Sequence, residues 1–229
     1  MINSIGRAAL PLALLAIPAG AVAAGHDQPV LSAEAEFQRV SGAAQAAFNA
    51  GRFGDALMIA RDAHAFAAGE FGPSHLLTLR TLNDMAVIHQ MQGNHAAALP
   101  LALRASGELE RTAGPDHPET LNALANLAQL HIRLDRRAEA EPLLRRVYAA
   151  RERTLGLTNE ATLGALLELA IFLNADRRLR EIVALLDRGA AAARTALGPE
   201  SGMAIDLADA AAAAKGLRPP SSTPANSPG

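Results

Sequence analysis

The chain has 229 residues, of which half are hydrophobic and 19% are charged, and its formal net charge is −2. This charge gives no attraction for nucleic acid or for an anionic membrane surface, so both are excluded as partners. The chain contains no cysteine, and therefore neither a disulfide framework nor a lipid-attachment site of the lipoprotein kind. Alanine is abundant and β-branched residues are few, which favours closely packed helices over sheets.

Residues 1–24 have the pattern of a secretory signal peptide. Arg7 gives the positively charged start, residues 8–17 form an apolar segment, and the small residues 21–23 form a cleavage site. We expect cleavage after Ala23 or Ala24, and hence a periplasmic or secreted protein.

A membrane anchor is the alternative interpretation of this segment. Pro11 and Pro18 interrupt the apolar run, which is shorter than the ~20 residues that a spanning helix needs. The signal-peptide interpretation is therefore preferred, with no membrane association after cleavage. Residues 25–31 are expected to form a short linker.

The rest of the chain is organised by a repeat of 42 residues. Similar phrases begin at regularly spaced glycines: GPSHLLTL, GPDHPETL, GLTNEATL and GPESGMAI, starting at Gly72, Gly114, Gly156 and Gly198. A repeat of this length is one supersecondary unit that buries its apolar face against its neighbours. The pattern predicts a repeat domain over residues 32–216, with repeats at about 32–72, 73–114, 115–156 and 157–198 and a cap at 199–216.

Two helical stripes follow one another in each repeat. In the first stripe, apolar residues recur at helical spacing, as at Leu79, Leu82, Met85 and Ala86. First helices are expected near 34–50, 75–92, 117–134 and 159–176, second helices near 53–69, 95–112, 137–154 and 179–196, and a final helix near 200–215.

The two helices of a repeat are separated by a short break. Gly51 and Gly93 provide the left-handed residue that ends the first helix. Asp135 and Arg177 occupy the same position later, so we expect this turn to form there without glycine, at some cost.

The sequence therefore predicts an all-α, right-handed superhelix of four helix pairs plus a C-terminal capping helix. HEAT and armadillo repeats also have periods near 40–47. The small residues at Ala86 and Ala98, the break at Gly93, and the aliphatic residues Leu82 and Leu101 decide between them. This pattern resembles the tetratricopeptide repeat (TPR).

The 42-residue period resembles the kinesin light chain type of this family. The segments that carry the resemblance are TLNDMA (81–86), GPDHPETL (114–121), LANLAQLH (124–131) and AEAEPLLRR (138–146). The resemblance covers residues 32–216. The Pro/Ser-rich residues 217–229 have little to bury and are expected to be disordered.

The motif GPDHPET at residues 114–120 invites a catalytic or metal-binding interpretation. A structural one fits better, because Asp116 or His117 would cap the next helix, Pro118 fits its first turn, and Glu119 meets the positive end of the helix dipole. No HExxH motif or other tight cluster of ligands occurs among the seven histidines. His89 and His131 lie one repeat apart and are interpreted as interhelix packing residues.

Nucleophile triads, phosphate-binding loops and dinucleotide fingerprints do not occur in the sequence. An open stack of helix pairs also offers no obvious water-excluding pocket of the kind that catalysis needs. We therefore expect no enzymatic activity, no cofactor and no metal site.

The resemblance implies a binding groove lined by the first helix of each repeat. In the family, asparagines at set positions of this helix bind the backbone of an extended peptide. The matching positions are Asn83 and Asp84, then Asn126, then Glu168. The other residues expected along the same groove are Arg80, Gln90, Asn122, Gln129 and Arg133.

An asparagine amide can donate and accept hydrogen bonds at once, so it can bind a peptide bond whatever the side chain. Ala125 and Leu167 replace the second asparagine that the family often has, and Glu168 offers only an acceptor. These departures disfavour an acidic peptide and favour a neutral or basic one. The alternative is that these are simply polar residues on a solvated helix face.

The function expected from these observations is that of a non-catalytic, exported scaffold or adaptor that binds a peptide segment or partner protein in its groove. The chain is expected to be a monomer. The alternative is a self-associating structural component of the cell envelope, in which the alanine-rich cap, with residues 210–214 all alanine, stacks on another copy.

Overall fold

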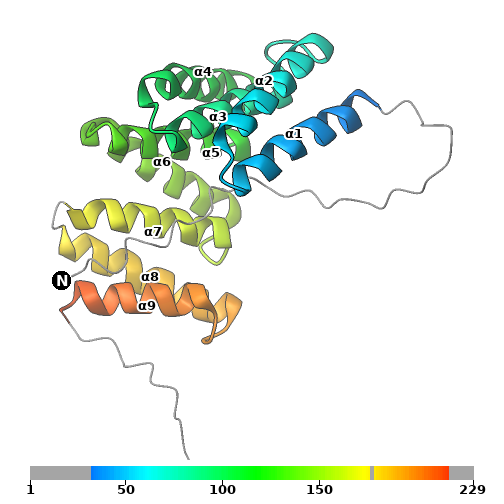
Figure 1. Ribbon diagram of the computed structural model, residues 1–229. Coiled ribbons are helices and arrows are strands. Elements are labelled where there is room, and N and C mark those ends of the chain that lie inside the picture. The colour runs from blue at the N-terminus through cyan, green and yellow to red at the C-terminus, as the bar shows by residue number, and fades with distance from the viewer. Residues whose placement is uncertain (1–31, 176–177, 217–229) are drawn as a thin grey trace, which may run out of the picture. The chain divides into compact units, whose positions relative to one another are not determined.

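Figure 1 shows the computed structural model of the protein, which describes residues 32–175 and 178–216. The predicted signal peptide, linker and C-terminal tail lie outside these residues, as does the expected turn at Arg177.

The described residues form α-helices joined by short connections. The helices are α1 (Ala33–Asn49), α2 (Phe53–Glu70), α3 (Leu76–Met91), α4 (His95–Ala113), α5 (Pro118–Arg133), α6 (Arg137–Leu155), α7 (Glu160–Ala175), α8 (Leu179–Leu197) and α9 (Gly202–Ala214). Every boundary lies within two residues of the range expected from the sequence. The all-α architecture of successive helix pairs is thus confirmed.

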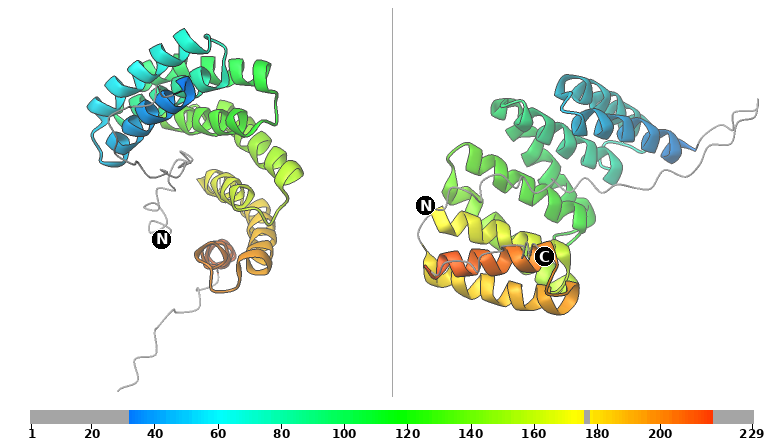
Figure 2. Two further views of the ribbon diagram at one scale, coloured as in Figure 1. Left: turned by 90° about the vertical axis from the view of Figure 1, so that its right-hand side faces the viewer. Right: turned by 60° about the horizontal axis from the view of Figure 1, so that its bottom comes forward.

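The chain forms two compact units, which divide between Leu143 and Leu144 inside α6. In the first unit α1 packs on α2, while α3 packs on α2, α4 and α5 (Figure 1). In the second unit α8 packs on both α7 and α9 (Figure 2).

Small side chains allow the helices of the first unit to approach closely. Ala56, Ala98 and Ala105 are fully buried, and Leu79 and Leu109 fill the space between them. Burial of a leucine side chain contributes about 2 kcal/mol. The stability of this unit therefore rests on many such contacts spread over consecutive helices.

The second unit has an even closer helix contact at Gly189 of α8. A Cβ atom there would lie 3.0 Å from Cδ1 of Leu166 in α7 and 3.6 Å from Cδ1 of Leu207 in α9. Glycine at this position lets α8 fit between its two neighbours.

The repeated glycines act as the sequence predicts. Gly114 and Gly198 follow directly on α4 and α8 with φ values of 100° and 89°, in the region that side chains rarely adopt. The next helix then begins at a side-chain cap: Nδ1 of His117 accepts a hydrogen bond from the backbone N–H of Glu119 at 3.2 Å. Of the two residues proposed as caps, His117 rather than Asp116 fills the role, and Pro118 opens α5 as expected.

The turn between α5 and α6 forms without glycine. Asp135 has a φ of 58°, close to the 75° of Gly93 at the same position one repeat earlier. The left-handed turn is therefore kept in the third repeat, with a residue that tolerates this conformation at a small cost.

None of the helices in the described part of the chain is both long enough and apolar enough to cross a membrane.

Candidate functional site

The polar face of α3 and α5 contains a pair of hydrogen-bonded asparagines. These two helices are the first helices of consecutive repeats, and they are in contact. Nδ2 of Asn126 donates to Oδ1 of Asn83 at 3.1 Å, and Asn83 is only 6% exposed. The bond fixes both side chains and leaves an N–H group of Asn83 and the carbonyl of Asn126 to bind a ligand. A peptide bond offers the complementary acceptor and donor.

Asp84 follows Asn83 directly in α3 and is partly buried. Burial raises the pKa of its carboxyl group to about 7; the charge of Arg80 opposes this rise and that of Glu119, on α5, adds to it. The guanidinium of Arg80 lies 5.7 Å from the ring centroid of Phe37 in α1, a cation–π contact. At neutral pH this part of the face therefore holds a carboxyl group that is close to its own titration point.

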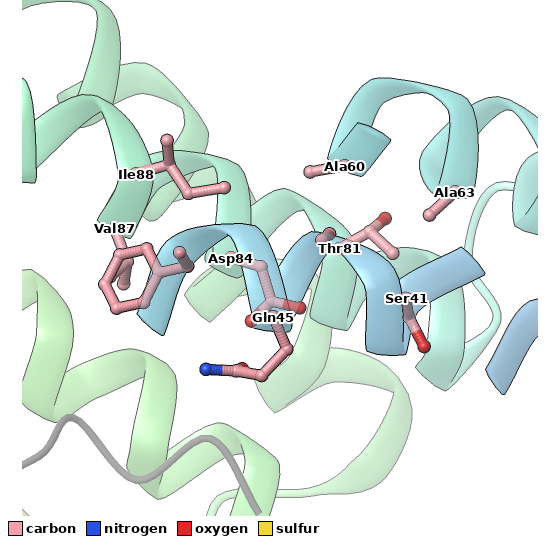
Figure 3. Close-up of a pocket in the computed structure, with 10 residues that line it drawn as sticks. Ser41, Gln45, Ala60, Ala63, Thr81, Asp84, Val87 and Ile88 are labelled. Carbon is pink, nitrogen blue, oxygen red and sulfur yellow. The ribbon is translucent and has the colours of Figure 1, made fainter. Parts of the chain in front are cut away.

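A cavity of about 390 Å³, partly open to solvent, adjoins Asp84 between α1, α2 and α3. Figure 3 shows Asp84 and Gln45 close to each other, with Thr81, Val87 and Ile88 also at the cavity. The residues that line it are Ser41, Ala44, Gln45, Phe48, Ala60, Ala63, Thr81, Asp84, Val87 and Ile88. The walls are thus mainly apolar, with a few polar groups at one place, as in many ligand pockets.

Comparison with known proteins agrees with this geometry. The family model described as tetratricopeptide repeat matches residues 39–107 and 86–153, which together are just over half of the chain. The chain belongs to the tetratricopeptide repeat family. Members of this family generally serve as scaffolds for protein interactions. Among curated proteins, no significant sequence match is found.

Solved structures of kinesin light chain repeats share the fold. The nearly identical TPR-like repeats of an assigned kinesin light chain from Podosopora anserina, and a point variant of the same repeats, have a TM-score of 0.70 at 22% identity. Each match covers 79% of this chain, and 86% and 85% of those two chains. BtubC (BKLC) from P. vanneervenii has a TM-score of 0.70 at 15% identity, covering 80% of this chain and 73% of that one. The predicted TPR-like solenoid of kinesin light chain type is therefore confirmed as the fold.

Several of the residues predicted to line the TPR groove come together. Asn83 lies against Asn126, and Asp84 lies in the field of Arg80. The remaining predicted residues of the first unit are on the same two helices: Gln90, Asn122 and Gln129 are half-buried, and Arg133 is exposed. Their part in binding stays a prediction.

Glu168 lies in α7, in the second unit, and is described with its own neighbours. Burial raises the pKa of its carboxyl group, and the nearby charge of Arg151 opposes the rise. Its Oε2 atom is buried without a hydrogen-bond partner. Arg151 donates from Nη1 to the carbonyl of Ala161 at 3.3 Å, and burial lowers its own pKa. This carboxylate is thus compensated by a neighbouring cation rather than by hydrogen bonds to its Oε2 atom.

The histidines predicted to pack between helices are buried on the same helices as the asparagine pair. His89 and His131 are 8% and 7% exposed. Burial lowers the pKa of both, so both are neutral at physiological pH. Within the described residues, no group of three or more potential ligands could hold a metal ion.

The part of the site that α1 contributes was not predicted from the sequence. Ser41 and Gln45 both line the cavity. A signal was present, because Ser41 is one 42-residue period before Asn83, and Gln45 is two periods before Gln129. The first repeat thus carries polar residues at positions already identified in the later repeats.

Proposed function

We propose that this protein is a non-catalytic TPR scaffold that binds an extended segment of a partner protein on the face formed by α3 and α5. The observation that carries the proposal is the hydrogen bond between Asn83 and Asn126. It holds a donor and an acceptor ready on one face, so less side-chain entropy is lost when a segment binds. Each hydrogen bond to the segment would contribute about 1 kcal/mol.

A selection of binding peptides tests this proposal and needs no identified partner. A displayed library of random twelve-residue peptides is selected on the full chain, and dissociation constants are measured by fluorescence anisotropy. We expect the double variant Asn83→Ala plus Asn126→Ala to weaken binding of the selected peptides at least tenfold. Gln92→Ala, which removes an exposed amide at the end of α3, is the matched control and should leave binding unchanged. Equal affinity of wild type and double variant would refute the proposal.

We also propose that the scaffold acts outside the cytoplasm, on the basis of the pattern in residues 1–24. Mass spectrometry of the protein isolated from its native host should find a mature N-terminus at Ala24 or Gly25. An intact Met1 on the mature protein would contradict export.

Self-association through the last helix is the second candidate. Ile205 of α9 is 43% exposed, so this helix presents an apolar residue that another copy could cover. Light scattering over a hundredfold range of concentration distinguishes the two candidates. The scaffold proposal expects a constant monomer mass, and a mass that rises with concentration would favour self-association.

A further inference from the structure

The cavity between α1, α2 and α3 carries a more specific inference, which rests on the proposed function. Its polar groups are unequal, since nearly all of the hydrogen-bond donors are already engaged within the protein. The hydroxyl of Thr81 donates to the carbonyl of Thr78 at 2.7 Å. That of Ser41 donates to the carbonyl of Gln38 at 3.4 Å. The amide nitrogen Nε2 of Gln45 donates to Oδ1 of Asn49 at 2.8 Å.

His64 does not supply a free donor either. Its Nδ1 atom lies 2.8 Å from Oγ1 of Thr81. Because the proton of that hydroxyl is already given to Thr78, Nδ1 of His64 must be the donor and Thr81 the acceptor. The donor of His64 is thus also used inside the protein.

The groups left at the cavity are acceptors. Oε1 of Gln45 is buried without a hydrogen-bond partner, and the carboxyl group of Asp84 lies close to Gln45 (Figure 3). An unsatisfied buried acceptor costs about 1–3 kcal/mol, which a bound donor would recover. A ligand that only donates hydrogen bonds therefore fits this end of the cavity.

The charges around Asp84 select the sign of the ligand. Arg80 on α3 brings one positive charge, but its guanidinium is placed over Phe37. Glu119 on α5 adds a negative charge to that of Asp84, and α1 faces the cavity with the uncharged Ser41, Ala44, Gln45 and Phe48. With Asp84 ionised, these three charged groups sum to one net negative charge.

The apolar walls select the shape. Ala44, Phe48, Ala60 and Val87 surround the polar end, and they can pack against a chain of methylene groups. A lysine side chain has this form: an apolar stem that ends in an ammonium group with three donors and no acceptor.

We propose that this cavity is a specificity pocket for a lysine side chain of the bound segment, whose ammonium group binds to Asp84 and to Oε1 of Gln45. Asp84 follows Asn83 in the chain, so the pocket begins beside the amides proposed to hold the backbone of the segment. The partner is thus a protein whose bound segment carries a lysine.

A fragment titration tests the pocket separately from the binding of a whole segment. The probe is n-butylammonium, with n-butanol as a neutral control, added to the full chain while NMR follows the methyl groups of Val87 and Ile88. At pH 8 we expect saturable shifts with n-butylammonium and at least tenfold weaker binding of n-butanol. Asp84→Asn should abolish the preference for the cation, whereas Asp62→Asn, which changes an exposed carboxylate of α2, should keep it.

The pH dependence identifies the responsible group. Binding of n-butylammonium should weaken about tenfold from pH 8 to pH 6, because Asp84 is mostly protonated at the lower pH. This dependence should vanish in Asp84→Asn; its persistence there would assign it to His64 on α2 and would contradict the proposal. Gln45→Leu should weaken cation binding several-fold, and it keeps the pocket testable if Asp84→Asn does not fold.

The outcomes of the two proposals are separable. The variant Asn83→Ala plus Asn126→Ala should still bind n-butylammonium, since those amides do not line the cavity. If the fragment binds but the selected peptides do not depend on the asparagines, the groove proposal alone fails. If the peptides depend on the asparagines but tolerate replacement of every lysine by norleucine with less than a threefold change in affinity, the lysine pocket fails.

Discussion

Asp84 in α3 and Glu168 in α7 occupy the same position of two repeats, two periods of 42 residues apart. Burial raises the pKa of both carboxyl groups, but the surroundings differ. Glu168 is compensated by Arg151, itself partly buried. Asp84 shares its surroundings with both Arg80 and Glu119, and its pKa reaches about 7.

The difference between these two positions shows that the repeat fixes the backbone but leaves the chemistry of the inner face open. The carboxyl group of α7 already has a cation inside its own unit. That of α3 is placed beside a cavity with unsatisfied acceptors. The first unit is therefore where we place the binding function, and the second unit provides an internally neutralised counterpart.

The largest expected effect is the pH dependence that Asp84 gives to the free energy of unfolding. Its pKa in the folded chain, about 7, is above the ordinary value of 3.8, so folding favours the protonated form. The stabilisation is fully present below about pH 3.8 and is lost as the pH rises through about 7. Between pH 5 and pH 8 wild type should lose about 2 kcal/mol relative to Asp84→Asn, allowing for partial exposure.

Urea unfolding of both proteins at the two pH values measures this difference. Asp62→Asn, at an exposed position, should follow wild type. Parallel pH profiles of wild type and Asp84→Asn would show that Asp84 titrates as an exposed carboxyl group does, and the contrast with Glu168 would disappear.

The next effect concerns the cation that compensates Glu168. Arg151→Met should destabilise the protein by about 1.5 kcal/mol at pH 8, since it leaves a buried carboxylate without its neighbouring charge. The loss should be smaller at pH 5, where Glu168 takes up a proton more readily. Adding Glu168→Gln should recover most of the stability in urea unfolding. An additive loss in the double variant would mean that the two side chains do not interact.

The asparagine at the equivalent position of α5 gives an uncharged reference. Asn126→Ala should cost about 1 kcal/mol, because the buried Oδ1 of Asn83 loses its donor. Unlike the effect of Asp84→Asn, this loss should be the same at pH 5 and pH 8. A double-mutant cycle with Asn83→Ala should give a coupling energy of about 1 kcal/mol, and a coupling near zero would show that the hydrogen bond does not contribute.

The smallest effect is expected at the turns that follow these helices. Asp135 and Gly93 have similar positive φ values, 58° and 75°. Asp135→Gly should stabilise the protein by about 0.5 kcal/mol, and Gly93→Ala should destabilise it by about 1 kcal/mol. Thermal unfolding of the two variants checks both signs. Destabilisation by Asp135→Gly would show that the aspartate side chain does more than tolerate the turn.

Much of the backbone could be predicted from the sequence because the glycine period and the apolar columns are local signals. Gly114 and Pro118 mark the end of one helix and the start of the next without reference to the rest of the chain. The choice of cap between Asp116 and His117 could not be made in this way, because either side chain can accept the same backbone hydrogen bond.

The site was predictable in part. The positions of Asn83 and Asn126 followed from the family pattern, and the structure places them in contact. The pocket was not foreseen, because it depends on the packing of α1 against α3 and on which donors Thr81 and Gln45 have already used. The pKa of Asp84 likewise depends on burial among several helices, which no local pattern records.

The most direct test of the proposed binding face is to locate a bound segment by NMR. A peptide selected on the full chain is titrated into the labelled protein, and the side-chain NH2 resonances of asparagine and glutamine are followed. We predict that those of Asn83, Asn126 and Gln45 shift together and saturate at one peptide per chain, while that of Gln92 stays in place. Saturable shifts that leave Asn83 and Asn126 unchanged would contradict this binding face.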